Sequence, residues 1–334
     1  MRASHLTLAA ATPRFELQSV PDPVEGPGEI AIDLVTAALN RRDWWIWRDP
    51  ATPVPAVLGS DGAGRVAGLG EGVTGFAPGD EVVIDPALGW GDDERAAAES
   101  FDILGSPTQG TFAERIVVPA ANVRRKPVAL SWEQAAAFPL AGLTAWRAVV
   151  TCAGAGRGRR ILITGGGSGV STFCIQIACA LGAEVWVTSG SESKIARCVE
   201  LGARGGVRYD DPDWPQQLRA ATGGEGVHAV VDSFGGEGWA QALAALARGG
   251  VLVNYGDTGG EEATIPVAGI YWAWRSLVGT TMGSPREFSA LCAHVESAAW
   301  RPAIDSVHPL ADLDVAARRL TEPDRFGKVV LRIA

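Results

Sequence analysis

The sequence predicts an α/β protein in which a doubly wound parallel sheet is inserted after a β-rich domain, and three observations support this fold class. Residues 29–123 consist of short strand patterns and tight turns. From 131 to 280, helix and strand patterns alternate, which is typical of a parallel sheet with helices on both faces. The chain ends on one more strand pattern, at 328–333, which we expect to rejoin the first domain.

The composition is that of a globular protein and excludes several classes of partner. The chain has 334 residues, of which 47% are hydrophobic and 20% charged, and this length is sufficient for two domains. Lys+Arg 29 against Asp+Glu 38 gives a net charge of −9, so we expect neither nucleic acid nor an anionic membrane as a partner. No stretch approaches the roughly 18 apolar residues that a membrane helix requires, and we expect a cytoplasmic protein.

The β-rich half contains strand patterns at 29–35, 64–69 and 81–84, separated by Pro-Gly turn signals. Between 90 and 109 the sequence becomes polar and rich in small residues. This composition indicates an exposed loop or lid, to which we assign no function.

The alternating half begins with a helix signal. Ser131, followed by Gln134, has the form of a capping box, in which each side chain binds the other residue's backbone N–H. Strand patterns then follow at 161–164, 185–188, 228–232, 251–254 and 276–280. A last helix pattern lies around 285–299.

A glycine-rich turn follows the first of these strands and opens an apolar helix pattern. Without a Cβ atom, the glycines allow the backbone to approach a pyrophosphate, whose charge is met by free N–H groups at the helix start. The turn alone is weak evidence, but a second apolar strand lies roughly 20 residues on, where a dinucleotide fold binds the ribose. The expected cofactor contacts are Gly166, Gly167, Ser168, Gly169 and Val170. Ser171 takes the place of the usual third glycine, so a hydroxymethyl group must fit where helix and strand pack closely.

The end of the second strand indicates the cofactor. An Asp or Glu there would accept hydrogen bonds from both ribose hydroxyls and repel a 2′-phosphate, but the residue is Ser189. Lys194 adds a cation one short helical turn on, so NADPH is favoured. The alternative is that Lys194 is a solvated charge facing Glu192.

Further cofactor contacts are expected at the carboxyl ends of the later strands, because ligands of open parallel sheets lie beyond those ends. The candidates are Ser233, Tyr255 and Gly256. Gly235 and Gly236 could equally be turn residues, since glycine clusters usually reverse the chain.

The order of these modules and several motifs resemble the medium-chain dehydrogenase/reductase superfamily over nearly the whole chain. The motifs are Asn40-Arg41-Arg42-Asp43, 57–66 (VLGSDGAGRV), 75–82 (GFAPGDEV), 139–146 (PLAGLTAW) and the glycine turn. The resemblance implies a GroES-like domain over 1–127 and 285–334 and a Rossmann dinucleotide-binding domain over 128–284. Within the superfamily, the chain resembles the zinc-free, quinone-oxidoreductase-like branch.

The positions of the zinc ligands support that branch. Zinc-dependent members hold the metal with a Cys, the His of a Gly-His-Glu triplet, and a Cys or Asp, whereas this chain has Asn40, Ser60 with Asp61, and Leu140. An amide, a hydroxyl and an aliphatic group do not make the donor set that Zn²⁺ requires. There is no cysteine before Cys152, so the four-cysteine structural zinc lobe is missing as well. We therefore expect no metal.

The resemblance also implies roles for residues near the nicotinamide and the adenosine. Asn40 and Thr144 would flank the nicotinamide, Met282 would lie near it, and Tyr209 would lie near the adenosine phosphates. Asn40 is the candidate catalytic residue, because its neutral amide can donate to an oxygen that gains charge.

The residues after Asn40 are the tentative substrate contacts. Asp43 and Trp44, followed by Trp45, would contact the substrate as part of an aromatic wall for a flat conjugated molecule. The alternative is that the tryptophans only pack.

No Ser/His/Asp or Cys/His set stands out, so no general acid is identified. Quinones and enones tolerate this, because a proton can come from water after hydride addition. We therefore expect an NADPH-dependent, zinc-independent oxidoreductase acting on a quinone or an activated alkene. The alternatives are an alcohol dehydrogenase-like carbonyl reductase and a non-catalytic NADPH-binding protein.

The segment 266–274 (PVAGIYWAW) is too apolar for a surface helix and precedes what would be an edge strand. We expect a homodimer that pairs these edges, as relatives with this module order commonly form. The alternative is that Tyr271, Trp272 and Trp274 pack under the glycine turn or line the substrate cleft of their own subunit.

Overall fold

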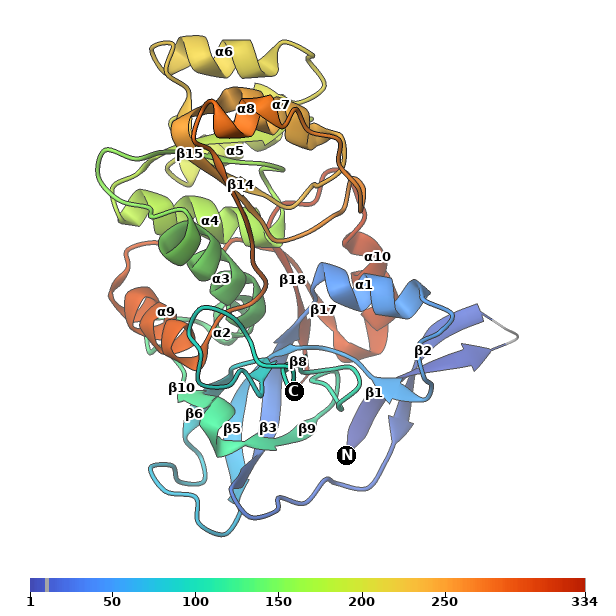
Figure 1. The fold of residues 1–334 in the computed structure, drawn as a ribbon. Coiled ribbons are helices and arrows are strands. Elements are labelled where there is room, and N and C mark those ends of the chain that lie inside the picture. The colour runs from blue at the N-terminus through green and yellow to red at the C-terminus, as the bar shows by residue number, and fades with distance from the viewer. Residues whose placement is uncertain (10–11, 334) are drawn as a thin grey trace. The chain divides into compact units, whose positions relative to one another are not determined.

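The structure, a computed structural model, describes residues 1–9 and 12–333 and divides the chain into two compact units. Unit 1 comprises Met1–Ala141 and Gly283–Ala334, and unit 2 comprises Gly142–Met282 (Figure 1). Within the described residues, no helix combines the length and the apolar character needed to cross a membrane.

Unit 1 is built on a seven-stranded sheet with the order β10-β6-β5-β3-β18-β17, and β9 also pairs with β3. Its strands are β3 (Glu29–Ala38), β5 (Asp61–Leu69), β6 (Glu81–Ile84), β9 (Arg115–Pro119), β10 (Val123–Arg125), β17 (Ile304–Pro309) and β18 (Lys328–Arg332). Two smaller sheets are formed by β1 (Arg2–Ala9), β2 (Thr12–Ser19) and β4 (Ala56–Val57), and by β7 (Ala87–Leu88) and β8 (Asp102–Ile103). The helices are α1 (Arg41–Arg48), α2 (Trp132–Ala137), α9 (Pro285–Ser297) and α10 (Leu313–Arg319), and α3 (Pro139–Trp146) spans the boundary of the units.

The C-terminal tail rejoins the first unit, as the sequence predicts. β18 pairs antiparallel with β3, with Val330 opposite Ala38 and Arg332 opposite Thr36. The first unit extends further along the chain than the sequence-based range of 1–127, because α2 packs on β3, β5 and β18. Ser131 caps α2 as expected, since its Oγ accepts the Gln134 N–H at 3.2 Å.

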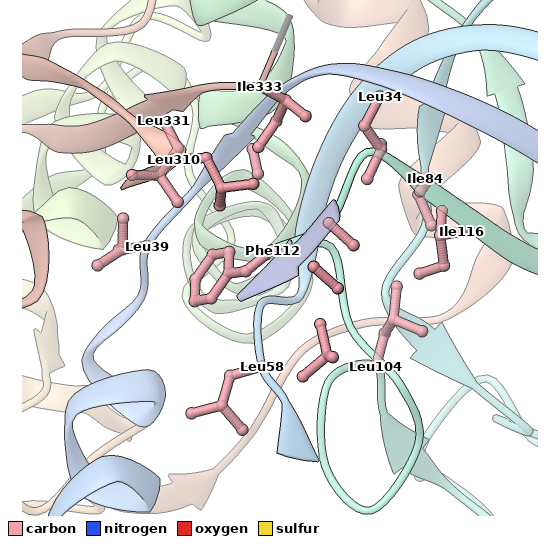
Figure 2. Packing of buried hydrophobic residues seen from close by; sticks show 14 of the residues in the cluster. Leu34, Leu39, Leu58, Ile84, Leu104, Phe112, Ile116, Leu310, Leu331 and Ile333 are labelled. Atoms are coloured by element: carbon pink, nitrogen blue, oxygen red, sulfur yellow. The ribbon is translucent and has the colours of Figure 1, made fainter. Parts of the chain in front are cut away.

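The core of unit 1 joins strands that are far apart in the sequence. Figure 2 shows Phe112 among aliphatic side chains that include Leu34, Leu104 and Leu331. All four are buried, and Phe112 has no exposed surface. Burial of apolar surface on this scale is the main stabilising term for the sheet.

The segment 90–109 is exposed over two stretches, 91–100 and 107–109. Residues 91–100 are almost all exposed, but Trp90 and Leu104 are buried. The Trp90 ring contacts Phe101 edge-on at 5.4 Å, and its Nε1 donates to the Asp93 carbonyl oxygen at 3.1 Å. The prediction of an exposed loop therefore holds for these two stretches and is wrong for Trp90 and for 101–106, which are buried or half-buried.

Unit 2 contains a six-stranded parallel sheet with the order β13-β12-β11-β14-β15-β16. Its strands are β11 (Arg160–Ile163), β12 (Glu184–Ser189), β13 (Gly205–Arg208), β14 (Val227–Asp232), β15 (Leu246–Asn254) and β16 (Ser276–Gly279). The connecting helices are α4 (Gly169–Ala180), α5 (Glu192–Glu200), α6 (Trp214–Ala221), α7 (Gly238–Ala245) and α8 (Ala268–Tyr271).

This strand order reverses direction at β11. The chain moves outward through β12 to β13 and then returns to place β14 on the other side of β11. Because crossovers between parallel strands are right-handed, the two halves place their helices on opposite faces of the sheet. The doubly wound fold predicted from the alternating pattern is confirmed, and the reversal creates the place where such sheets bind ligands.

Candidate functional site

The glycine turn connects β11 to α4 and has a backbone that other residues would not adopt easily. Gly165 and Gly167 have φ angles of +66° and +103°, in the left-handed region that favours glycine. A Cβ atom on Gly166 would lie 2.9 Å from the Cys198 sulfur. Ser168 caps α4 by accepting the Ser171 N–H at 3.1 Å. The turn therefore presents the N-terminus of a 12-residue helix, where free N–H groups favour an anion.

Ser171 fits at the position of the usual third glycine. Its side chain has no exposed surface, and its Oγ lies 3.0 Å from the carbonyl oxygens of Gly165 and Ser168. The Ser168 hydroxyl also donates to Ser171 Oγ at 2.9 Å. The extra hydroxymethyl group is thus hydrogen-bonded inside the turn, where it links the first and last residues of the bend.

Asp232 ties together the carboxyl ends of three neighbouring strands. Its carboxylate accepts from Thr164 Oγ1 at 2.6 Å, from the Gly235 N–H at 2.9 Å and from Trp239 Nε1 at 3.0 Å. Asn254 Nδ2 lies 3.3 Å away. Asp232 is buried and fully engaged, so it holds the edge in shape. Gly235 has a φ of +72°, which supports its interpretation as a turn residue.

Ser233 and Tyr255 follow β14 and β15 at this edge. The Tyr255 phenol interacts with Ser168 and Ser233, but its burial dominates and raises its pKa well above the usual value. Within the described part of the chain, its buried hydroxyl has no partner at hydrogen-bond geometry. A Cβ atom on Gly256 would lie 3.2 Å from the Ser233 carbonyl oxygen. The structure thus brings Ser168, Ser233, Tyr255 and Gly256 together beside the turn.

The end of β12 forms a second part of the site. Ser189 is buried, and its Oγ accepts the Ser191 N–H at 3.3 Å. Tyr209 lies close over Gly190. A Cβ atom on Gly190 would be only 2.5 Å from the Tyr209 hydroxyl, so a larger residue would not fit there. Ser191 caps α5, which carries the half-buried Lys194 in its first turn.

Arg208 is a cation that the sequence reasoning missed. It is the register partner of Ser189 across β12 and β13, and it forms an ion pair with Asp210. The signal was present as the residue before Tyr209, but only the strand register places it beside Ser189.

Thr144 and Met282, which lie far apart in the sequence, are in contact. Thr144 Oγ1 lies 3.9 Å from the Met282 sulfur, and both residues are buried. Met282 has a φ of +50°, which is uncommon outside glycine and is found most often at functional sites.

In unit 1, Asn40, Asp61 and Lys328 form a closed set that we call the polar cluster. Lys328 Nζ donates to Asn40 Oδ1 at 2.6 Å and to Asp61 Oδ2 at 2.9 Å. Asn40 Nδ2 donates to the same Asp61 oxygen at 2.9 Å, and the Leu140 N–H donates to Asp61 Oδ1 at 2.7 Å. The three side chains are 7%, 0% and 2% exposed. An ammonium and a carboxylate are therefore held in a nearly dry setting, with a carboxamide between them.

Asp43 lies next to the polar cluster and is also buried. Its Oδ2 accepts the Asn40 N–H at 2.7 Å at the start of α1, a helix that the sequence analysis did not predict. Burial raises the pKa of Asp43 to about 6, while Arg42 and the bond from Asn40 oppose the rise. The carboxyl group therefore titrates near neutrality.

The tryptophans of α1 divide between packing and exposure. Trp47 is buried and donates to the Pro13 carbonyl oxygen at 3.1 Å. Trp44 packs edge-on against Trp47, with 5.1 Å between the ring centroids. The packing alternative therefore holds for Trp47 and in part for Trp44, whereas Trp45 is 46% exposed.

The residues at the zinc-ligand positions do not fit a zinc ion. Asn40 and Asp61 are both bound to Lys328, whose ammonium already provides the local positive charge. Ser60 donates to the Leu104 carbonyl oxygen at 2.6 Å and accepts from Arg42, and Leu140 contributes a backbone N–H. Zinc requires thiolate, imidazole or carboxylate ligands, and a cation placed here would be repelled by the ammonium.

Comparison with known proteins gives consistent similarities. The Alcohol dehydrogenase GroES-like domain family matches residues 26–128, and the Zinc-binding dehydrogenase family matches residues 169–297. The zinc-type alcohol dehydrogenase-like protein YogA of Leptosphaeria maculans is 34% identical over 96% of this chain and 94% of its own length. Quinone oxidoreductase 1 of Escherichia coli is 30% identical over 72% of this chain and 67% of its own. A solved structure of an NAD-dependent alcohol dehydrogenase matches with a TM-score of 0.93 and 40% identity, covering 100% of both chains.

Removal of the Lys328 charge should strongly destabilise the protein. In Lys328→Met, the Asp61 carboxylate stays buried without its counter-charge, so we expect a loss of about 3–5 kcal/mol in the free energy of unfolding, measured in urea. The double variant Lys328→Met/Asp61→Asn removes both charges and should recover part of that loss. Equal losses in the single and double variants would contradict a buried ion pair.

Asp43 should make stability depend on pH. Its folded-state pKa of about 6 lies above the usual value, so the stabilisation is present below about pH 4 and is lost as pH rises through 6. The wild-type free energy of unfolding relative to that of Asp43→Asn should fall by about 3 kcal/mol between about pH 4 and 7. Burial also raises the pKa of Asp85, to about 7, but Asp85 is common to both proteins and cancels. The control Asp49→Asn, at an exposed carboxyl, should not change the pH profile.

Proposed function

The chain belongs to the medium-chain dehydrogenase/reductase superfamily and is an oxidoreductase of that family, and we propose that it uses NADPH, without zinc, to reduce a quinone or an activated alkene. The observation that carries the proposal is the polar cluster. In it, the Lys328 ammonium donates to the side chains of both Asn40 and Asp61.

Unit 2 supports dinucleotide binding at the carboxyl edge of its sheet. The glycine turn and the N-terminus of α4 provide backbone N–H groups for a pyrophosphate, and among the described residues the buried Tyr255 hydroxyl has no partner at hydrogen-bond geometry. When bound, the cofactor supplies a hydride. The protein binds and orients it through the turn, Ser233, Gly256 and the Thr144–Met282 contact.

The choice of NADPH rests on the end of β12. Ser189 has no carboxylate to repel a 2′-phosphate, and Lys194 and Arg208 provide cations on the elements around it. The similar solved structure is described as an NAD-dependent alcohol dehydrogenase. Ser189, Lys194 and Arg208 together favour NADPH over NADH.

We assign Asn40 the task of stabilising the substrate oxygen that gains negative charge. One hydrogen of its amide is given to Asp61, and the second remains to donate. Lys328 donates to the amide oxygen, which polarises the amide and strengthens its remaining N–H as a donor. The proton that completes the reduction comes from water.

Two other functions differ in what they require. An alcohol dehydrogenase-like carbonyl reductase needs stronger stabilisation of the substrate oxygen than one amide provides. When a simple ketone accepts a hydride, the negative charge stays on its single oxygen. A non-catalytic NADPH-binding protein would share the unit 2 features and would turn over no substrate. We therefore favour quinone or alkene reduction over both of these functions.

We further propose a homodimer formed through β16. This strand is the edge of the unit 2 sheet, and Tyr271, Trp272 and Trp274 before it are 58%, 67% and 68% exposed. The alternative that these rings pack under the glycine turn does not hold, because packed rings would be covered. A second copy would pair the open edge of β16 and cover the aromatic rings.

Steady-state assays test the cofactor and the substrate. We expect NADPH to be preferred, and Lys194→Ala and Arg208→Ala each to raise KM for NADPH about tenfold with little effect on NADH. Arg204→Ala removes an exposed charge of the same unit and is the matched control. Quinones or enones should be reduced faster than simple ketones, and a chelator should not change the rate.

Strong NADH preference or chelator sensitivity would overturn the proposal. Single-turnover mixing of bound NADPH with small electrophiles tests the remaining alternative, a non-catalytic NADPH-binding protein. If no electrophile oxidises the bound cofactor, the chain is a cofactor-binding protein without turnover.

Light scattering at micromolar concentration tests the dimer. Wild type should have the mass of two chains, and replacing Ile270 and Trp272 by Glu should give monomers, because the interface would bury charge without a partner. A monomeric wild type would reject the dimer. A double variant with unchanged mass but altered substrate KM would assign these residues to the substrate site.

A further inference from the structure

Unit 2 contains a cavity of about 360 Å³ whose walls carry four arginines. Its lining residues are Arg160, Arg219, Glu225, His228, Leu246, Ala247, Arg248 and Arg275. The cavity is strongly cationic in a chain of net charge −9, since Glu225 is the one carboxylate among these eight residues.

The cavity lies at the amino edge of the sheet, opposite to the glycine turn. Arg160 is the first residue of β11, Leu246 is the first residue of β15, and Arg275 directly precedes β16. Because all the strands are parallel, these starts lie at one edge and the strand ends at the other. The six residues of β14 separate the edges by about 20 Å. The cavity is therefore distinct from the dinucleotide edge.

Three of the guanidinium groups are held in place by neutral carbonyl oxygens. Arg275 Nη2 donates to the Leu246 carbonyl at 2.6 Å, Arg219 Nη2 to Gly224 at 2.7 Å and Arg160 Nε to Gly226 at 3.0 Å. These bonds fix the side chains without neutralising them. Arg160 also pairs with Glu225, whose side chain is 70% exposed.

The arginines are close enough for their positive charges to repel one another. Burial lowers the pKa of Arg275, and the charges of Arg219 and Arg248 lower it further. Arg275 Nε is buried, and within the described residues it has no hydrogen-bond partner. Arg248 is exposed and stacks on Trp274, with 4.5 Å from its Cζ to the ring centroid. A bound anion would relieve this repulsion.

The pKa of His228 depends on the charged groups around the cavity. Its Nδ1 accepts the Arg160 N–H at 2.9 Å, so this nitrogen carries no proton. Burial lowers the pKa of His228, Arg160 and Arg159 lower it further, and Glu225 opposes them. Arg219, Arg248 and Arg275 line the same cavity.

We propose that this cavity binds a small anion carrying linked phosphate groups, of the diphosphate class, at a site separate from the dinucleotide. The volume is in the range of small-ligand pockets, roughly 300–1,000 Å³. Planar guanidinium forks match the oxygen pairs of phosphate groups. Several cations with a single, exposed carboxylate suit an anion of more than one charge. Leu246 and Ala247 add an apolar wall.

Calorimetry with pyrophosphate on the full chain saturated with NADPH tests the proposal, because the cofactor blocks the glycine turn. We expect one pyrophosphate per chain. Inorganic phosphate and succinate are comparators and should bind more weakly. Tighter binding of succinate would overturn the phosphate assignment, and no pyrophosphate binding at millimolar concentration would overturn the site.

Variants locate the site. Arg248→Gln should weaken pyrophosphate binding about tenfold, since one charge-assisted contact is lost, and Arg248→Lys should restore part of it. The matched control Arg204→Gln removes an exposed charge at the start of β13 and should bind as wild type does. If Arg204→Gln is weakened as much as Arg248→Gln, the binding is general surface attraction and the proposal fails. Light scattering on each variant should show an unchanged mass.

NMR titration of the four histidines gives a readout independent of activity and of the proposed reaction. Bound pyrophosphate should raise the pKa of His228 by about one unit, because a nearby anion favours the imidazolium. The NMR signals of the other three histidines should not respond to pyrophosphate. An unchanged His228, with a shift at another histidine, would place the anion elsewhere.

Discussion

The buried ion pair between Lys328 and Asp61 is the constraint on which unit 1 depends. Both groups are nearly inaccessible to water, and removing each charge from water costs several kcal/mol. The pair is retained only because each group is otherwise hydrogen-bonded, Lys328 to Asn40 and Asp61 to Asn40 and Leu140. These bonds fix the start of β18, the start of β5 and the residue before α1 at one point.

The same constraint determines the chemistry that unit 1 offers. A metal can exchange ligands and bind the substrate oxygen directly, whereas the Lys328 ammonium is committed to two acceptors. Because Lys328 is only 2% exposed, the donor that we assign to the substrate is the second N–H of Asn40, strengthened by the charge behind it. A neutral donor of this kind stabilises charge that is already delocalised better than charge on a single alkoxide, which is why quinones and enones suit the site.

The sequence predicts the parts of the structure that depend on local pattern. Strands β3, β5, β6 and β18 of unit 1, five of the six strands of the unit 2 sheet and the glycine turn follow from periodicity and from residues with special backbone freedom, and β18 was expected to rejoin the first unit. Strand β13 was not predicted. The polar cluster was not predicted, because Lys328 lies 267 residues from Asp61 and no local pattern in either segment indicates that the two residues pair. Arg208 was missed for a similar reason, since its place beside Ser189 is set by the register of two strands. Helix α1 was missed because its tryptophans resemble strand or core sequence.

The parallel sheet of unit 2 explains how two anion sites can exist without interfering. At the carboxyl edge, polar side chains such as Asp232 form the hydrogen bonds that shape the turns, and backbone N–H groups remain for a ligand. At the amino edge, the arginines bind backbone carbonyl oxygens and leave their charge unneutralised. The glycine turn at one edge therefore attracts a pyrophosphate through neutral dipoles, and the cavity at the other edge attracts anions through full charges. Because full charges are screened by salt more strongly than dipoles at short range, binding at the amino edge should weaken more with ionic strength.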